Sequence, residues 1–101
     1  MLLEHKYLIV CVEFHHPPCN PSAIADWMRQ LVQDIRMKVL MEPFSVYSDM
    51  PGNQGLMSVT IIETSHIAVH VWDEASPALM QIDVYSCAEF DPQLIFDRLQ
   101  S

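Results

Sequence analysis

The apolar residues of this chain gather in short runs that have the length of β-strands. β-branched and apolar residues dominate positions 7–14, 39–48, 56–63, 66–73 and 78–86. Pro43 bends the second of these runs or places it at a sheet edge, because proline cannot donate a hydrogen bond to a neighbouring strand. Thr64 and Ser65 form the expected tight turn between the third and fourth runs. The pattern therefore predicts five strands.

Two other stretches have the spacing of helices. Apolar side chains recur every three or four residues over 22–37, and Ser22 is the expected N-cap. Asp91-Pro92 is a cap followed by a first-turn proline, which predicts a second, short helix. The order β-α-β-β-β-β-α predicts a single α+β domain over residues 1–101. Its expected form is a two-layer sandwich, an antiparallel sheet with both helices on one face.

Alternation along the fourth run assigns its side chains to two faces of the sheet. Ile67, Val69 and Val71 form an aliphatic face that belongs under a helix. His70 and Trp72 therefore point to the face without helices.

The helix-free face is expected to hold Ser65, His70 and Cys87, together with the hydroxyl groups of Ser58 and Thr60. Aromatic side chains share this face, so an ordinary solvated surface is not expected. A second sheet can cover it, and a homodimer with its sheets face to face is the inferred arrangement.

Charge and composition argue against several classes of partner. The net charge is −8 and charged residues make up 18% of the chain, so charge-driven binding of nucleic acid or anionic membrane is not expected. This balance fits a cationic ligand. No apolar run approaches the ~20 residues of a membrane span, and the N-terminal residues lack the layout of a signal peptide.

The cysteines indicate a reducing compartment. Cys11, Cys19 and Cys87 are odd in number and have no repeated spacing, so disulfides are not expected and the cytoplasm is the predicted location. His15, His16 and Cys19 lack a fourth ligand, and no metal site is expected.

One part of the chain combines the residue types that nucleophilic attack and proton transfer require. Ser65, two histidines and Cys87 occur there in an order that resembles the prokaryotic S-adenosylmethionine decarboxylase proenzymes. That family has a Glu-Ser-His-Ile/Leu-x-x-His-Thr-Trp-Pro-Glu segment followed by Asp-x-x-x-Cys. The matching positions are Glu13, Phe14, Ser65, His66, Ile67, His70, Trp72, Glu74, Asp83, Cys87, Asp91, Pro92, Phe96 and Leu99.

The resemblance implies a pyruvoyl-dependent decarboxylase of S-adenosylmethionine in polyamine (spermidine) synthesis. The Ser65 Oγ would attack the Thr64 carbonyl, and β-elimination from the resulting ester would divide the chain between residues 64 and 65. Ser65 would become a pyruvoyl group, which forms a Schiff base with the substrate amine and accepts electrons as carbon dioxide leaves. By the family pattern, His70 assists processing and Cys87 donates a proton.

Two departures from the family pattern lie near the expected cleavage point. Thr64 replaces a glutamate that is implied to contact the substrate ribose. The family's Gly-x-Ser-Gly, whose serine helps processing, is here Gly55-Leu56-Met57-Ser58, which moves the hydroxyl to the other face unless a bulge restores it. Ser58 remains a processing candidate with Thr64, Ser65 and His70.

These departures leave two alternatives open. One is a decarboxylase of arginine or ornithine on the same scaffold. The other is an unprocessed, non-catalytic paralogue that binds a ligand or regulates a partner enzyme.

Four residues are candidates for substrate binding: Glu13, Phe44, Trp72 and Glu74. Phe44 and Trp72 can stack on a flat ring such as adenine, but they can equally pack at the dimer interface. His66, next to the expected nucleophile, is interpreted as structural.

Overall fold

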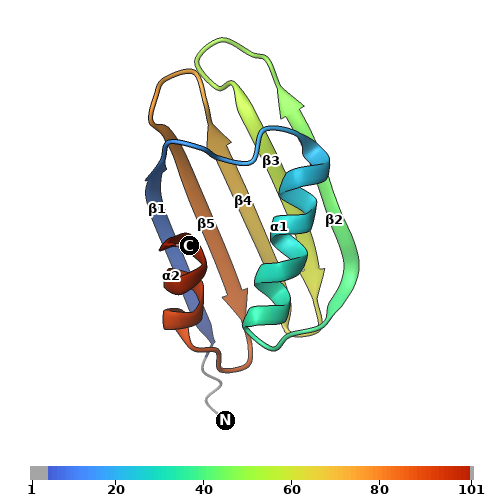
Figure 1. Cartoon of the computed structure of the whole chain (residues 1–101). Helices are drawn as coiled ribbons and strands as arrows, with labels where there is room; N and C mark the ends of the chain where they lie inside the picture. Colours follow the sequence, from blue (N-terminus) through green and yellow to red (C-terminus); the bar gives the residue numbers. More distant parts are fainter. Residues whose placement is uncertain (1–4, 101) are drawn as a thin grey trace.

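Five antiparallel strands form one sheet, and two helices lie on the same face of it (Figure 1). The computed structural model describes residues 5–100, so residues 1–4, which enter the signal-peptide prediction, lie outside the described part. The elements are β1 (Lys6–Phe14), α1 (Pro21–Asp34), β2 (Val39–Ser48), β3 (Gly55–Ile62), β4 (Ser65–Trp72), β5 (Ala78–Ser86) and α2 (Pro92–Gln100). The strand order is β1-β5-β4-β3-β2. The predicted α+β sandwich and its element order are confirmed.

Helix α1 begins one residue before the expected N-cap. Asn20, not Ser22, caps it: the Asn20 Oδ1 accepts a hydrogen bond from the Ala23 N–H at 2.8 Å. Pro21 fills the first turn, where its missing N–H leaves no hydrogen bond unmade. Asparagine and serine are comparable N-caps. Pro21 favours Asn20 as the cap, because proline is preferred at the first position of a helix.

The same helix ends at Asp34, three residues earlier than the apolar spacing predicts. Arg36 adopts a left-handed φ of 60°, which turns the chain back on the helix. Its N–H donates to the Gln33 carbonyl, and the Met37 N–H donates to the Val32 carbonyl, each at 3.0 Å. These two bonds form a Schellman motif and satisfy carbonyls at the helix end.

The hydrophobic core lies between the helices and the sheet. The aliphatic face of β4 is fully buried, as predicted, and it packs with buried residues of α1, β3, β5 and α2. In α2, Asp91 caps the helix by accepting from the Gln93 N–H at 3.0 Å, and Ile95 and Leu99 are buried. The predicted start of this helix is confirmed.

The turn between β3 and β4 lies one residue earlier than expected. Ile62 and Ser65 are paired across it, so Glu63 and Thr64 are the two turn residues and Ser65 opens β4. At the sheet edge, the register of β2 shifts on both sides of Met41, next to Pro43. The predicted effect of this proline on an edge strand is confirmed.

The face of the sheet without helices is strongly apolar for a solvent-facing surface. Residues of four strands lie exposed on it, with 40–69% of their surface accessible: Tyr7, Ile9, Met41, Phe44, Val46, Val59, Ile61 and Leu79. A group of exposed large apolar residues on one sheet face is typical of an interaction surface.

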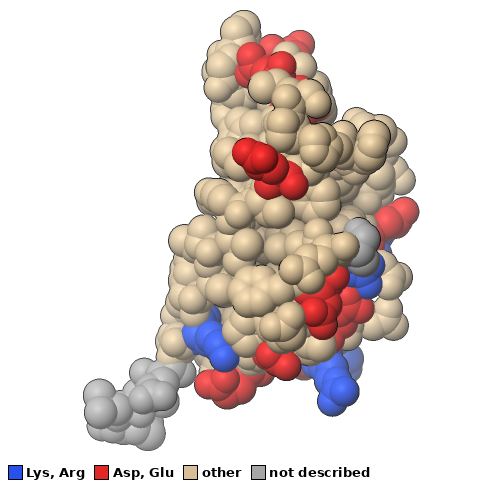
Figure 2. All heavy atoms as spheres, turned by 60° about the vertical axis from the view of Figure 1, so that its left-hand side comes forward, with Lys and Arg blue, Asp and Glu red and all other residues tan. Residues whose placement is uncertain are grey.

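On the side of the molecule drawn in Figure 2, most of the charged side chains are acidic and a few are basic. Figure 2 shows the acidic side chains in separate patches between large areas of uncharged residues. Neither of the helices described in residues 5–100 is long and apolar enough to cross a membrane.

Candidate active site

The Thr64–Ser65 peptide bond lies at one end of the sheet, where the β3–β4 turn meets the end of β5. The Thr64 carbonyl oxygen accepts a hydrogen bond from the Cys87 N–H at 3.0 Å. The Thr64 hydroxyl accepts from the Ser86 hydroxyl at 2.9 Å and donates to the Met37 sulfur at 3.3 Å. The carbonyl and the hydroxyl of Thr64 are therefore held by the protein, and its side chain is directed to the helix side, where Ser86 is buried.

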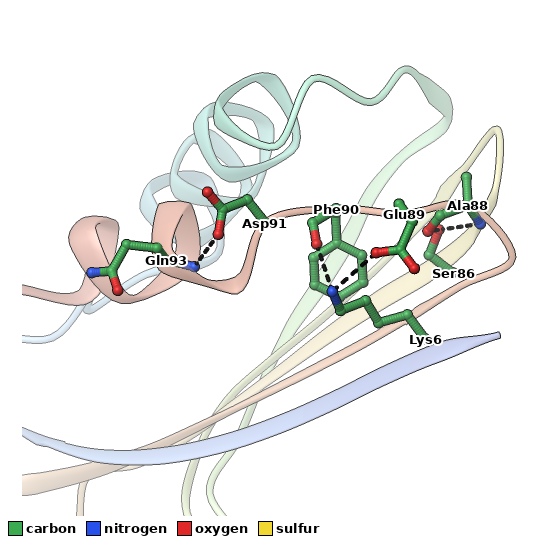
Figure 3. Close-up of polar contacts among 7 residues, drawn as sticks. All are labelled: Lys6, Ser86, Ala88, Glu89, Phe90, Asp91 and Gln93. Carbon is green, nitrogen blue, oxygen red and sulfur yellow. Dashed lines mark hydrogen bonds and ion pairs between the residues drawn. The ribbon is translucent and has the colours of Figure 1, made fainter. Parts of the chain in front are cut away.

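The segment that carries Cys87 is fixed by a series of contacts between β5 and α2 (Figure 3). The Ser86 hydroxyl lies 3.0 Å from the Ala88 N–H and 2.8 Å from the Ala88 carbonyl. Lys6 forms an ion pair with Glu89 at 3.1 Å and donates to the Phe90 carbonyl at 3.0 Å. The buried Phe90 ring anchors the loop in the core. These contacts hold the Cys87 N–H against the Thr64 carbonyl.

Ser65 has an unusual backbone and a histidine partner. Its φ is 158°, a positive value that residues other than glycine seldom adopt and that is concentrated at functional sites. Its Oγ lies 3.1 Å from the Nδ1 of His66. The sequence interpretation of His66 as structural missed this contact, although the adjacency of a serine and a histidine in the motif was a visible signal.

His66 lies in a cluster of aromatic rings on the helix-free face. Its imidazole stacks on the Tyr85 ring with centroids 5.7 Å apart, and Tyr85 also contacts the Tyr7 ring and the His5 imidazole. The Tyr85 hydroxyl and the His5 Nδ1 are hydrogen-bonded. The orientation of the His66 ring is set by these neighbours.

Asp83 places a carboxylate beside this cluster. Its Oδ2 accepts from the Tyr7 hydroxyl at 2.7 Å, and this hydrogen bond raises the pKa of Tyr7 above its ordinary value. Its Oδ1 is buried and has no hydrogen-bond partner within residues 5–100. A buried carboxylate oxygen without a donor favours the approach of a cation or an N–H group.

His70 lies far from Ser65 in the same chain. The two residues are five positions apart on one extended strand, which corresponds to about 16 Å. His70 is opposite Gln81 and Met57, and its ring stacks on Trp72 with centroids 5.4 Å apart. His70 lies on the helix-free face, as expected, but this length of strand separates it from Ser65 of the same chain, whereas the end of β5 brings Cys87 next to Thr64 and Ser65.

Ser58 and Thr60 lie on the other face of the sheet from the one predicted. Both are buried on the helix side, in register with Val69 and Ile67. The β3–β4 pairing continues from residue 57 to 62 without a bulge, so nothing restores the Ser58 hydroxyl to the face of His70. Its partner is the Ser45 hydroxyl at 2.8 Å.

The substrate-binding candidate Glu74 is occupied by backbone contacts. Its carboxylate accepts from the N–H groups of Gly52 and Gln54, at 3.2 and 2.9 Å, and so holds the β2–β3 loop. The indole N–H of Trp72 donates to Asn53 in the same loop at 2.9 Å. In this chain Glu74 is therefore a loop-fixing residue at the end of the sheet opposite Ser65.

The other two substrate-binding candidates are exposed on the helix-free face. Glu13 lies opposite Leu79, which also pairs with Trp72, so it shares the far end of the sheet with Trp72. Phe44 is 69% exposed and lies opposite Val59, near the middle of the face. None of the four candidates lies beside Ser65 of its own chain.

A cleft of about 730 Å³ opens on the helix side of the turn, between the end of α1 and the start of α2. It reaches Thr64 and is lined by Arg36, Glu63, Glu89 and Asp91 together with apolar residues. Solvent and small molecules can therefore approach the turn from the side opposite His66.

Comparison with known proteins gives one consistent result. The sequence profile of S-adenosylmethionine decarboxylase matches residues 15–101. The chain is 34% identical over 98 residues to the S-adenosylmethionine decarboxylase proenzyme of Pyrococcus abyssi and 33% identical over 98 residues to that of Pyrococcus horikoshii. Each alignment covers 94% of this chain and 66% of the relative. The proenzyme of Pyrococcus furiosus is 34% identical over 82 residues, 78% of this chain and 58% of its own length. The chain spans no more than about two thirds of the length of these relatives.

Proposed function

Since the chain belongs to the S-adenosylmethionine decarboxylase family, we propose that it is a proenzyme that cleaves itself between Thr64 and Ser65. The mature protein would be a pyruvoyl-dependent lyase that decarboxylates S-adenosylmethionine in spermidine synthesis, in the cytoplasm. The products of cleavage would be a chain of residues 1–64 and a chain that begins at position 65.

The observation that carries this proposal is the hydrogen bond from the Cys87 N–H to the Thr64 carbonyl, at 3.0 Å. Attack by the Ser65 Oγ on this carbonyl would put negative charge on its oxygen. A backbone N–H that is already aimed at that oxygen stabilises the charge without reorganisation. The positive φ of Ser65 marks the same bond.

The residues around position 65 fit a pyruvoyl group. Such a group withdraws electrons from a bound substrate amine and so lowers the barrier to loss of carbon dioxide. Ser65 pairs with Ser86 across the sheet, which brings the next residue, Cys87, beside it. Cys87 is an exposed free thiol, and we assign it the role of proton donor to the substrate carbon.

We propose that the working unit is a homodimer with the helix-free faces in contact. Eight large apolar residues on this face are 40–69% exposed in the single chain. His70 lies about 16 Å from Ser65 of its own chain. A second copy, turned end to end, would bring its His70 toward the first copy's Ser65, where it can assist processing.

A charge placed at the centre of this face tests the dimer. Val59→Asp is expected to give a monomer in analytical ultracentrifugation and to lose self-cleavage, because a carboxylate cannot be buried there without a partner. Gln30→Asp adds the same charge on the exposed side of α1 and serves as the control. A wild-type chain that sediments as a monomer would contradict the dimer.

The surroundings of the cleavage point favour a positively charged substrate. The residue before Ser65 is threonine, and its hydroxyl is held by Ser86 and Met37, so position 64 offers no carboxylate to a ribose. Asp83 leaves one carboxylate oxygen without a donor, which supports a substrate that carries positive charge. S-adenosylmethionine meets this condition, and arginine or ornithine, which also meet it, are the second candidates.

Intact mass spectrometry of freshly purified protein tests the proposal. Two chains, divided after Thr64, are expected from the wild type and one from Ser65→Ala. Reduction with borohydride in the presence of S-adenosylmethionine, arginine or ornithine then adds the mass of the amine to the second chain only where that amine is bound at the carbonyl. A wild-type chain that stays whole on incubation would overturn self-cleavage.

One observation favours the alternative of an unprocessed paralogue. Ser58, the serine nearest to the family's processing serine, is buried on the opposite face from His70. A whole wild-type chain that binds S-adenosylmethionine in calorimetry and releases no carbon dioxide would establish a binding role. A whole chain that binds no amine would leave only a structural role.

A further inference from the structure

His66 holds its Nδ1 at 3.1 Å from the Oγ of Ser65, the atom that would attack the scissile carbonyl. We propose that His66 is a catalytic residue of the self-cleavage, the base that activates Ser65 in the first step. This inference rests on the proposed function and adds to it the group that starts the reaction.

The contact does not follow from ordinary strand geometry. Side chains of neighbouring residues on a strand point to opposite faces. Ser65 is the first residue of β4 after a two-residue turn, and it is paired with Ser86, which is buried on the helix side. Its Oγ nevertheless contacts the ring of His66, and its φ is 158°. The backbone of the turn thus brings a hydroxyl and an imidazole together that a regular strand would separate.

The imidazole is held in a defined orientation. Tyr85 lies opposite His66 in the sheet, and the two rings stack at an interplanar angle of 15°. The Tyr85 ring is in turn fixed by its contacts with Tyr7 and His5. On its other side His66 faces Ile61 of β3. A side chain fixed by its neighbours loses little entropy when it acts as a base.

During ester formation, His66 takes one proton from Ser65 and later returns it. The Nδ1 of His66 accepts the proton of the Ser65 hydroxyl as the Oγ bonds to the carbonyl carbon of Thr64. The Cys87 N–H stabilises the negative charge on the carbonyl oxygen. The bond between that carbon and the Ser65 nitrogen then breaks, and His66 returns the proton to the nitrogen. The product is an ester with a free amine, and no other reactant is consumed.

His66 and His70 thereby take separate steps. His66 touches the serine of its own chain and serves ester formation. His70, which reaches Ser65 only from a second copy, is left for the later β-elimination. Loss of either histidine would leave the chain whole, but only the loss of His70 would leave it as an ester.

Hydroxylamine distinguishes these two states, because it cleaves esters and spares amides. His66→Phe keeps a flat ring on Tyr85 and removes the nitrogen, and His66→Asn provides a second variant without the bulk. Both are expected to slow self-cleavage by roughly 100-fold or more, the typical contribution of general acid–base catalysis. Their whole chains are expected to resist hydroxylamine, whereas the whole chain of His70→Asn is cut after residue 64. His15→Asn, the same change at an exposed histidine, is the control and is expected to process like the wild type.

Circular dichroism and thermal melting identify the variants that are folded. A slowing of less than tenfold in the folded His66 variants would overturn the role of His66 while self-cleavage itself stands. An ester that accumulates in them would also overturn it, since His66 would then act after ester formation. A wild-type chain that is neither cleaved nor cut by hydroxylamine would overturn self-cleavage and the role of His66 together.

Discussion

Replacing Ser86 with alanine is expected to loosen the turn that carries the scissile bond. The Ser86 hydroxyl is fully buried and connects the end of β5 to the β3–β4 turn: it lies 2.9 Å from the Thr64 hydroxyl and accepts from the Ala88 N–H. Alanine keeps the Cβ and the backbone of this position, so the change removes the hydroxyl with little effect on packing. The expected results are a lower free energy of unfolding and slower self-cleavage.

The magnitude follows from the bonds that are lost. A hydroxyl has one proton, so Ser86 donates either to the Thr64 hydroxyl at 2.9 Å or to the Ala88 carbonyl at 2.8 Å, and it accepts one bond from the Ala88 N–H at 3.0 Å. Two hydrogen bonds at about 1 kcal/mol each give about 2 kcal/mol. Ala88 is exposed, so water can replace part of this loss. The expected decrease in the free energy of unfolding is therefore about 1–2 kcal/mol.

Urea denaturation measures this decrease, with Ser65→Ala as the parent so that every chain stays whole. Thr60→Val is the matched control: it removes another fully buried hydroxyl, which donates to the Met41 carbonyl at 2.6 Å. It is expected to cost about 1 kcal/mol. In the protein that keeps the native Ser65, Thr60→Val is expected to leave the rate of self-cleavage unchanged, whereas Ser86→Ala is expected to slow it. A Ser86→Ala chain that is as stable as its parent, or that is cleaved at the wild-type rate, would refute this reasoning.

Three further predictions concern the rest of the fold. Gly55→Ala is expected to cost about 3 kcal/mol or more, because an added Cβ would lie 1.7 Å from the Val71 carbonyl oxygen; a urea midpoint near that of the wild type would contradict this. Arg36→Gly is expected to stabilise the protein by about 0.5–1 kcal/mol, because glycine adopts the left-handed φ of 60° without strain. An unchanged or lower stability in urea would contradict this, since the Arg36 side chain would then contribute more stability than its strained backbone removes. The hydrogen bond to Asp83 raises the pKa of Tyr7 in the folded state, so its stabilising effect is complete below pH 10 and is lost as pH rises through the raised pKa. Absorbance titration is expected to show that Tyr7 and Tyr47 ionise late, and Asp83→Asn should lower the pKa of Tyr7 alone, because the pKa of Tyr47 is raised by burial and by Asp73.

The elements of the fold could be read from the sequence because they depend on local periodicity. The aliphatic face of β4, the edge position of the proline-containing β2 and the Asp91 cap of α2 are each set by neighbours within a few residues. The predicted start and end of α1 were wrong because local sequence signals compete there. Asn20 with Pro21 and the left-handed Arg36 outweighed the apolar spacing that extends over 22–37.

Only part of the candidate site could be predicted from the sequence. The sequence determined that Ser65 and Cys87 end neighbouring strands, and antiparallel pairing of β4 with β5 then brings them together. The distance of His70 could also have been inferred, since five residues of strand span about 16 Å. The position of Ser58 followed from alternation with Leu56 and Ile62, both buried on the helix side.

Other features were decided only by the tertiary structure. The order β1-β5-β4-β3-β2 determines that Tyr85 stacks on His66 and that Tyr7 reaches Asp83. The hydrogen bond from Cys87 to the Thr64 carbonyl and the contact of Ser65 with His66 depend on the backbone of one turn. Periodicity is a property of the extended chain, so it assigns each side chain to a face. Contacts between segments far apart in sequence depend on which strands pair and in what register, and only the packed sheet sets these.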